Sequence, residues 1–137
     1  MSPSVRRKEF RVPSDLGAVQ KASAKALSFL KPLGADPSIL FDIRLCLEEA
    51  LINAIKYGNR FQKDRRVRLE VVFDRRKVEI SVEDEGAGFD PQRLEDCTKN
   101  RNLLKNCGRG IYLMHRLMDE VQYNTRGNGV RMTKWIK

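Results

Sequence analysis

The stretch CLEEALINAIKYGN, residues Cys46–Asn59, decides the fold. Its apolar residues recur at the spacing of an amphipathic helix, which we expect over about residues 37–57, with Gly58 as its stop. Glu49 and Asn53 lie one turn apart on the other side of this helix, between narrow apolar flanks. This placement predicts the floor of a partly enclosed pocket. From this helix alone, an exposed face with incidental charges remains the alternative.

Composition narrows the class of protein. The 137 residues are 41% hydrophobic, which predicts one domain over 1–137 with a real core. No apolar run suits a membrane span or a signal peptide. One histidine and three scattered cysteines argue against a zinc site or a disulfide framework and favour a reducing cytoplasm. The net charge of +9 predicts an acidic partner, and without a helix-turn-helix signature or paired aromatics nucleic acid is a minor hypothesis.

The remaining pattern predicts an α+β fold. Helices are expected over 15–32, capped by Ser14, and over 110–118. Alternating apolar residues predict strands at 7–12, 67–73, 78–82, 121–125 and 130–136. The polar stretch at 85–107 is longer than usual connections, which indicates a functional loop. Helices on one face of a mixed, mainly antiparallel sheet, a two-layer α/β sandwich, are the economical arrangement.

A second candidate site follows the strand at 78–82. Asp84 has the parity of that strand's apolar residues, so we expect it on the buried face, where a carboxylate needs donors. Gly86 and Gly88 allow the backbone to approach a ligand closely. An acid followed by Gly-x-Gly suits a base with an exocyclic amine, such as adenine. The alternative is a strand-ending turn in which Asp84 caps local amides.

A third candidate site is Gly108-Arg109-Gly110, where the long loop becomes a helix. The free amides and positive dipole end of a helix N-terminus suit phosphates, and Arg109 adds a permanent cation. A plain helix start is the alternative. The apolar residues that follow, from Ile111 on, are expected to belong mainly to the core. His115 is expected to be a surface or packing residue.

The order and spacing of these motifs resemble the Bergerat-type, histidine-kinase-like ATP-binding fold. A helix with Glu-x-x-x-Asn precedes a strand ending in Asp-x-Gly-x-Gly, and a long loop then ends in Gly-x-Gly before a helix. Within this fold the chain looks most like the anti-sigma-factor serine/threonine protein kinases, over roughly residues 10–137. The phrases that carry this resemblance are EEALINAIKYGN, VEDEGAGFD, GRGIYLMHRLMDEV and GNGVRMTKWIK.

The resemblance implies a role for each motif. Glu49 would be the general base for the attacking hydroxyl, and Asn53 would coordinate the magnesium that bridges the ATP phosphates. Asp84 would accept a hydrogen bond from the adenine amine, residues 99–110 would form a lid, and Lys56 would contact phosphate. The residues so assigned to cofactor binding are Asn53, Lys56, Asp84, Gly86, Gly88, Gly108, Arg109, Gly110 and Ile111.

The implied function is phosphorylation of a serine on an anti-sigma-factor antagonist, with ATP and Mg²⁺, in alternation with sequestering a sigma factor or equivalent effector. A homodimer is expected from the family, without direct contact to nucleic acid or membrane. The alternatives are a non-catalytic ATP/ADP-binding partner-switching regulator, the catalytic half of a histidine kinase, and a basic nucleic-acid-binding module. Two positions depart from the family: Tyr57 replaces a frequent histidine, and Gly129 replaces a threonine near the nucleotide.

Overall fold

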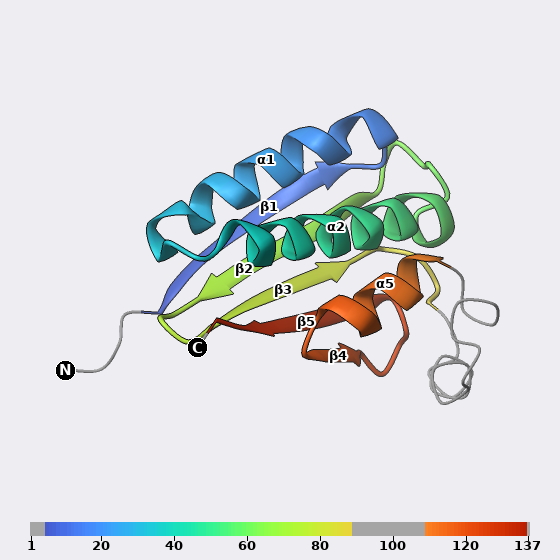
Figure 1. The fold of residues 1–137 in the computed structure, drawn as a ribbon. Helices are drawn as coiled ribbons and strands as arrows, with labels where there is room; N and C mark the ends of the chain where they lie inside the picture. Colours follow the sequence, from blue (N-terminus) through green and yellow to red (C-terminus); the bar gives the residue numbers. More distant parts are fainter. Residues whose placement is uncertain (1–4, 89–108, 137) are drawn as a thin grey trace.

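All the helices lie on one face of a five-stranded sheet in the computed structural model, which describes residues 5–88 and 109–136 (Figure 1). The strands are β1 (Arg6–Pro13), β2 (Arg66–Phe73), β3 (Lys77–Glu83), β4 (Glu120–Tyr123) and β5 (Gly129–Trp135). Their order in the sheet is β1-β2-β3-β5-β4, and every pairing between these strands is antiparallel. The predicted α+β sandwich is confirmed. Its expected parallel component is not seen among the described strands.

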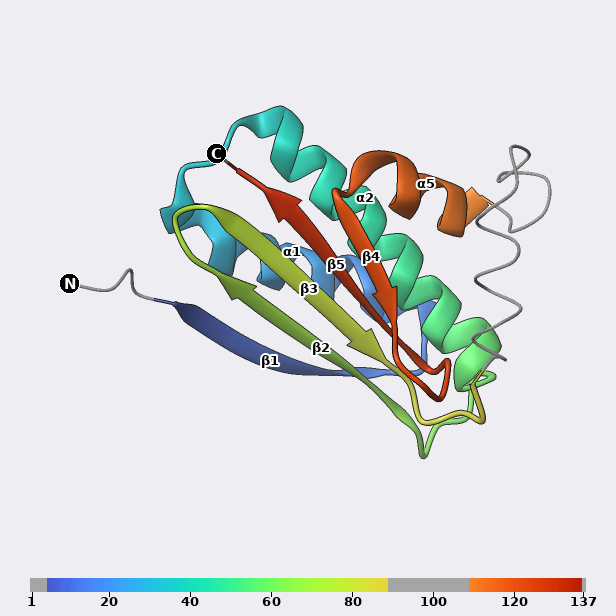
Figure 2. The ribbon, with the colours of Figure 1, turned by 90° about the horizontal axis from the view of Figure 1, so that it is seen from below.

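The alternation in β2 and β3 explains how the sheet has one buried and one exposed face. Every second residue of both strands is buried under the helices, and the intervening residues face outward. On the outer face, seen in Figure 2, Arg68 pairs across the strands with Glu9 and Glu83. Asp74 closes the hairpin by accepting hydrogen bonds from the backbone N–H groups of the residues two and three positions on.

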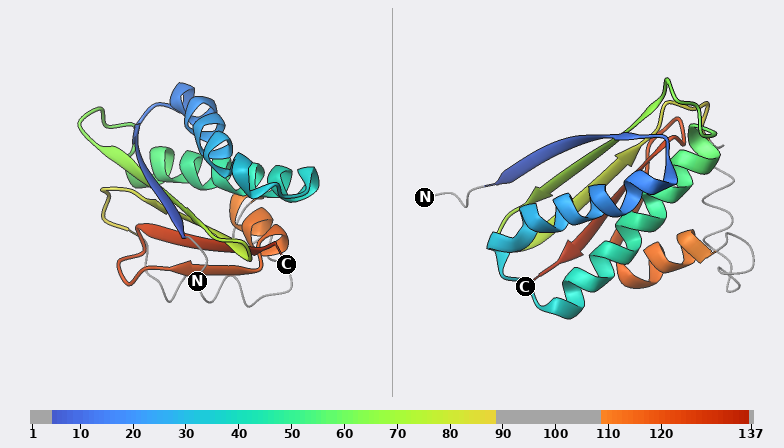
Figure 3. Two further views of the ribbon diagram at one scale, coloured as in Figure 1. Left: turned by 90° about the vertical axis from the view of Figure 1, so that its left-hand side faces the viewer. Right: turned by 90° about the horizontal axis from the view of Figure 1, so that it is seen from above.

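Helix α2 (Pro37–Asn53) lies between α1 (Val19–Leu30) and α5 (Arg109–Leu117) and packs against both (Figure 3). Its inward stripe follows the helical period, and each side chain in that stripe is 0% exposed. The stripe consists of Ile43, Leu47, Leu51 and, one turn beyond α2, Ile55. A fully buried aliphatic side chain stabilises a fold by about 1.5–3 kcal/mol relative to exposure, so this stripe fixes the position of α2 on the sheet.

The helix expected over 15–32 is interrupted at both ends. It begins in the 3-10 turn η1 (Leu16–Ala18) and ends in the 3-10 turn η2 (Lys31–Leu33), with α1 between them. The prediction that Ser14 caps it is wrong, because Asp15 accepts the capping hydrogen bond from the backbone two residues on, at 3.0 Å. Ser14 lies at the end of β1 and is buried, so its hydroxyl points into the protein.

The helix expected to reach Tyr57 does so, but its last turn changes type. After α2 the chain continues as the π-helix η3 (Ala54–Gly58), where the backbone N–H of Asn59 donates to the carbonyl of Ala54 at 2.7 Å. Single π turns within helices often occur at functional sites. The closing hairpin is confirmed as β4–β5. Most of the predicted loop at 85–107 lies outside the described residues.

Within residues 5–88 and 109–136, no helix combines the length and apolar character that crossing a bilayer requires.

Candidate functional site

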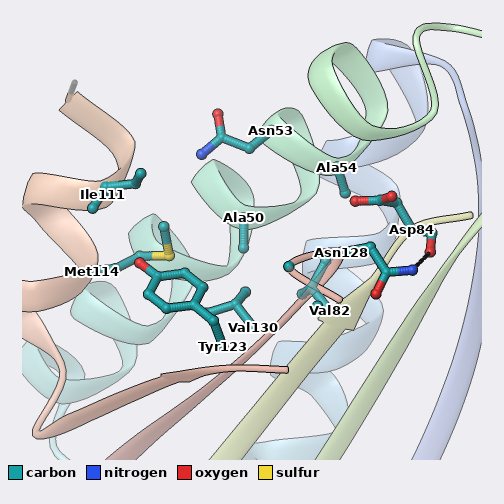
Figure 4. A pocket seen from close by; sticks show the side chains of 12 residues that line it. Ala50, Asn53, Ala54, Val82, Asp84, Ile111, Met114, Tyr123, Asn128 and Val130 are labelled. Carbon is teal, nitrogen blue, oxygen red and sulfur yellow. Dashed lines mark hydrogen bonds between the residues drawn. The ribbon is translucent and has the colours of Figure 1, made fainter. Parts of the chain in front are cut away.

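A pocket opens between the C-terminal half of α2, the start of α5, and the ends of β3 and the β4–β5 hairpin (Figure 4). Of the predicted residues, Asn53, Asp84 and Ile111 line it. Most of the remaining lining is small or apolar and includes Ala50, Ala54, Val82, Met114 and Val130. A mainly apolar wall with a few convergent polar groups is the usual make-up of a small-molecule site.

Asp84 is the residue just after β3, and its carboxylate lines this pocket. Its Oδ1 accepts a hydrogen bond from the backbone N–H of Gly86 at 2.8 Å, and no other residue in the described part of the chain donates to this side chain. Burial raises the pKa of Asp84, an effect that the hydrogen bond from Gly86 partly offsets. The described residues therefore leave the other oxygen, Oδ2, available to a ligand N–H group.

Glycines surround Asp84 because no side chain would fit there. A methyl group on Gly58 would lie 2.2 Å from Asp84 Oδ2, and one on Gly86 would lie 2.2 Å from the carbonyl oxygen of Gly58. Gly88 has φ +85°, and a methyl group on it would lie 2.0 Å from the carbonyl oxygen of Arg126. Gly86 and Gly88 thus seat the segment after β3 against its neighbours. Gly58, predicted only as a helix stop, makes room for Asp84.

The first and third motifs meet where α2 faces the start of α5. A methyl group on Gly110 would lie 2.9 Å from Asn53 Nδ2 and 3.1 Å from Glu49 Oε2. Glu49 and Asn53 are both half-buried, which agrees with a partly enclosed pocket rather than a fully solvated helix face. The structure therefore brings Glu49, Asn53 and Gly110 together at one end of the pocket.

One predicted residue stands apart from this cluster. Lys56 is exposed and does not line the pocket, and its Nζ lies 5.4 Å from the centroid of the Tyr57 ring. Arg109 is the first residue of α5. Gly108 and most of the predicted lid lie outside the described residues. Ile111 was expected mainly in the core; it is partly buried against the core and also lines the pocket.

Two buried asparagines that the sequence reading did not single out hold the backbone around Asp84. Asn128 donates from Nδ2 to the carbonyl of Asp84 at 2.9 Å, and the carbonyl of Asn128 accepts from the N–H of Asp84 at 2.9 Å (Figure 4). Asn59 accepts from the N–H of Glu85 through Oδ1 at 2.8 Å. Their exposed fractions are 6% and 0%. Asn59 follows the helix stop and Asn128 lies in an Arg-Gly-Asn-Gly turn, so spacing alone reveals neither.

The wall of the pocket across from Asp84 contains Tyr123. Its hydroxyl lies 3.2 Å from Nε2 of His115. Burial lowers the pKa of His115 and raises the pKa of Tyr123 to about 12, so both side chains are neutral near pH 7. His115, expected to be a surface or packing residue, is half-buried and packs on Tyr123, which lies in the pocket wall.

Gly129 stands where the family often has a threonine, and its neighbours in the structure explain the glycine. It lines the pocket, and a methyl group on it would lie 2.6 Å from Asn124 Nδ2. That nitrogen donates to Asn128 Oδ1 at 2.7 Å and to Glu83 Oε2 at 3.3 Å. A threonine at this position would displace Asn124, so the glycine is required by the hydrogen bonds that support Asn128.

Comparison with known proteins identifies the family. Residues 12–134 match the histidine kinase-like ATPase domain. The chain belongs to this ATPase family. The matched range includes the elements that build the pocket. The ATPase domain and the kinase relatives described next together imply ATP use.

Curated relatives of this ATPase-family chain include serine-protein kinases. RsbW of Listeria monocytogenes is 28% identical over 102 residues, covering 69% of this chain and 65% of the relative, so the match spans just under two thirds of that protein. RsbW of Staphylococcus aureus strain RF122 is 28% identical over 139 residues, covering 94% of this chain and 86% of the relative. The resemblance to serine kinases that the motifs indicated is confirmed by these relatives.

Solved structures of two proteins share the fold of this ATPase-family chain. The RsbU and RsbW domains of Rv1364c from Mycobacterium tuberculosis align with a TM-score of 0.65 at 18% identity, covering 96% of this chain and 32% of that one. A chain of the SiaB–SiaC complex from Pseudomonas aeruginosa aligns with a TM-score of 0.69 at 15% identity, covering 94% and 88%. At these identities the comparison supports the fold alone.

Proposed function

We propose that this chain is an ATP-dependent protein serine kinase of the anti-sigma type. It transfers the γ-phosphate of ATP to a serine of a small antagonist protein and, in alternation, binds a sigma factor or equivalent effector. The observation that carries this proposal is that Asp84 and Asn53 line one pocket, with Glu49 beside Asn53 where α2 faces Gly110. The serine-protein kinases among the relatives support the reaction class.

The base of ATP fits the end of the pocket at Asp84. Adenine needs an acceptor for its exocyclic amine and an apolar slot for its faces. Asp84 Oδ2 supplies an acceptor that no described residue occupies, and Ala50, Ala54 and Val82 line the slot. Because burial raises the pKa of Asp84, a donor from the ligand is more favourable here than at a solvated carboxylate.

The phosphates fit the end at Asn53 and Gly110. The N-terminus of α5 lies beside Asn53 at Gly110, and a helix N-terminus offers backbone N–H groups and the positive end of its dipole to an anion. Gly110 has no side chain between that helix end and Asn53. Mg²⁺ usually keeps several waters and takes one or two protein oxygens besides those of substrate phosphates, so the amide oxygen of Asn53 suits it. When bound, the ion would neutralise charge on the phosphates.

Glu49 is the group best placed to act on the attacking hydroxyl. It lies one turn from Asn53 on α2, and its Oε2 is close to Gly110 at the start of α5. A carboxylate there orients the serine hydroxyl of the antagonist and takes its proton. The rest of catalysis is positioning and charge stabilisation, as in other phosphoryl transfers.

The partners follow from the same proposal. The antagonist supplies the phosphoacceptor serine, and the net charge of +9 suits acidic protein surfaces. We extend the proposal to a homodimer acting in the cytoplasm, where a sigma factor or similar effector would be bound.

Phosphoryl transfer provides the direct test. The full chain is incubated with labelled ATP, Mg²⁺ and candidate antagonist proteins encoded nearby, and phosphoserine is measured. Glu49→Gln should lower the transfer rate by about 100-fold or more, because a general base contributes about 10²–10⁴-fold, while ATP affinity changes little. The matched control is Glu48→Gln on the same helix turn, which should leave transfer intact.

The outcomes separate the alternatives. Transfer by Glu49→Gln at the wild-type rate would remove Glu49 as the base. ATP binding without transfer to any antagonist would favour a non-catalytic partner-switching regulator. Absence of both ATP binding and transfer would overturn the proposal.

A further inference from the structure

We propose that Asn59 is a positioning residue for base recognition: it anchors the backbone beside Asp84 so that the carboxylate faces the pocket. This inference rests on the proposed role of Asp84 toward adenine. Asn59 lies just after η3 and does not itself line the pocket. It would therefore act through the segment after β3 rather than on the nucleotide.

The side chain of Asn59 is held at both ends of its amide group. Its Oδ1 accepts from the backbone N–H of Glu85 at 2.8 Å, and its Nδ2 donates to Ser14 Oγ at 3.0 Å. Ser14 Oγ in turn donates to the carbonyl oxygen of Arg65 at 2.6 Å. With 0% exposure, Asn59 has no water to replace these partners, so its orientation is fixed by the chain alone.

Asp84 and Glu85 need such an anchor because the sheet does not hold them on both sides. The β3–β5 pairing ends at Glu83, and Asp84 is then bonded through its backbone N–H and carbonyl to Asn128. The next backbone donor, the N–H of Glu85, is bonded to Asn59. The segment is therefore fixed from the β4–β5 turn on one side and from the end of η3 on the other.

The anchor controls the carboxylate through one further bond. The N–H of Gly86 donates to Asp84 Oδ1 at 2.8 Å and so determines which oxygen remains for a ligand. Releasing the N–H of Glu85 would free the adjoining peptide and allow the N–H of Gly86 to move. Asp84 would then lose its fixed direction even though its own side chain is unchanged. A displacement near 1 Å is enough to weaken a directional contact strongly.

Asparagine is the side chain that this position demands. One side chain must supply an acceptor for the N–H of Glu85 and, close to it, a donor for Ser14 Oγ, in a space without solvent. An aspartate would place a charge there and lose the donor, and an apolar residue would leave the N–H of Glu85 unsatisfied.

Nucleotide selectivity distinguishes positioning from general destabilisation. Equilibrium dissociation constants for ATP and GTP, with Mg²⁺, are measured for the full chain, Asn59→Ala and Asp84→Asn. Asn59→Ala should bind ATP about 10- to 100-fold more weakly, with a smaller change for GTP, because guanine has a carbonyl oxygen at position 6, where adenine has the amine that Asp84 would accept from. The ATP-over-GTP preference should therefore fall in both variants.

Ser14→Ala is the matched control. It removes the Ser14 end of the buried network but leaves the bond between the N–H of Glu85 and Asn59 Oδ1 in place, so thermal stability should fall while the ATP-over-GTP preference is kept. If Asn59→Ala does not fold, Asn59→Ser is measured instead, because its shorter hydroxyl cannot reach both partners. Unchanged preference in the folded Asn59 variant, with Asp84→Asn impaired, would overturn the positioning role alone. Unchanged ATP binding in Asp84→Asn would overturn the proposed base site itself.

Discussion

Gly58→Ala is the smallest substitution that should disable the site. Gly58 does not have a positive φ, so alanine is allowed by the backbone and the effect is purely steric. The added methyl group would lie 2.2 Å from Asp84 Oδ2, whereas ordinary contacts begin at 3.4 Å. The carboxylate must therefore move by more than an ångström, which breaks the 2.8 Å hydrogen bond from Gly86.

The expected magnitudes follow from that displacement. A hydrogen bond to a charged group contributes about 1.5–3 kcal/mol, so losing the adenine contact should weaken ATP binding by roughly 10- to 150-fold. Overpacking costs about 1–3 kcal/mol of unfolding free energy. Calorimetric titration with ATP gives the affinity, and urea unfolding shows that the variant is folded under those conditions.

Gly17→Ala is the control for this experiment. Gly17 is exposed and has no positive φ, and a methyl group on it would meet its nearest neighbour, Asp15, at 3.5 Å. Both ATP affinity and stability should stay close to wild type. If folded Gly58→Ala binds ATP as tightly as wild type, the carboxylate of Asp84 does not hold the nucleotide in the position inferred from the structure.

Three further predictions concern titratable groups whose pKa is shifted by burial. Asp84→Asn should raise the free energy of unfolding at pH 7 while weakening ATP binding. The folded-state pKa of Asp84 is raised, so its contribution to stability is lost as pH rises through that pKa. Urea unfolding of both proteins at pH 4 and pH 7 checks this. For His115 the folded-state pKa is lowered, so its contribution is present above the ordinary value of 6.5 and is lost as pH falls below it. The unfolding free energy measured from pH 7.5 to 5 should therefore fall less in His115→Gln, and this residue is the chain's one histidine. Burial raises the pKa of Cys46 to about 12, so in a variant whose two other cysteines are serine, thiol reagents at pH 8 should react rapidly only after denaturation.

The fold was largely predictable because periodicity reports directly on burial. The alternation of β2 and β3 and the helical spacing in α2 each correspond to a buried face in the structure. The ends of the helices were less predictable. The cap at Asp15 rather than Ser14 depends on a buried hydrogen-bond network that joins segments distant in sequence. The π turn η3 depends on packing at the end of α2, which has no compositional signature.

The candidate site was predictable where a motif carries its own chemistry. Glu49, Asn53 and Asp84 were singled out as acids and an amide at unusual positions; Asn53 and Asp84 line one pocket, and Glu49 lies near Asn53 beside Gly110. Asn59 and Asn128 could not be found in this way, because their function depends on partners 26 and 44 residues away. A single sequence shows the residue type but not which backbone group it will meet.

The end of β3 collects features that a protein selected for stability alone would avoid. A carboxylate with a raised pKa lies beside Gly58, in the π-helix η3. A methyl group on Gly58 would clash with this carboxylate, and one on Gly86 would clash with the carbonyl of Gly58. The outer face of the sheet differs, since exposed partners such as Arg68 and Glu9 there are simply paired. Local departures from stable design are concentrated at functional sites. Their concentration around Asp84 does not depend on the relatives, and it points to the same site.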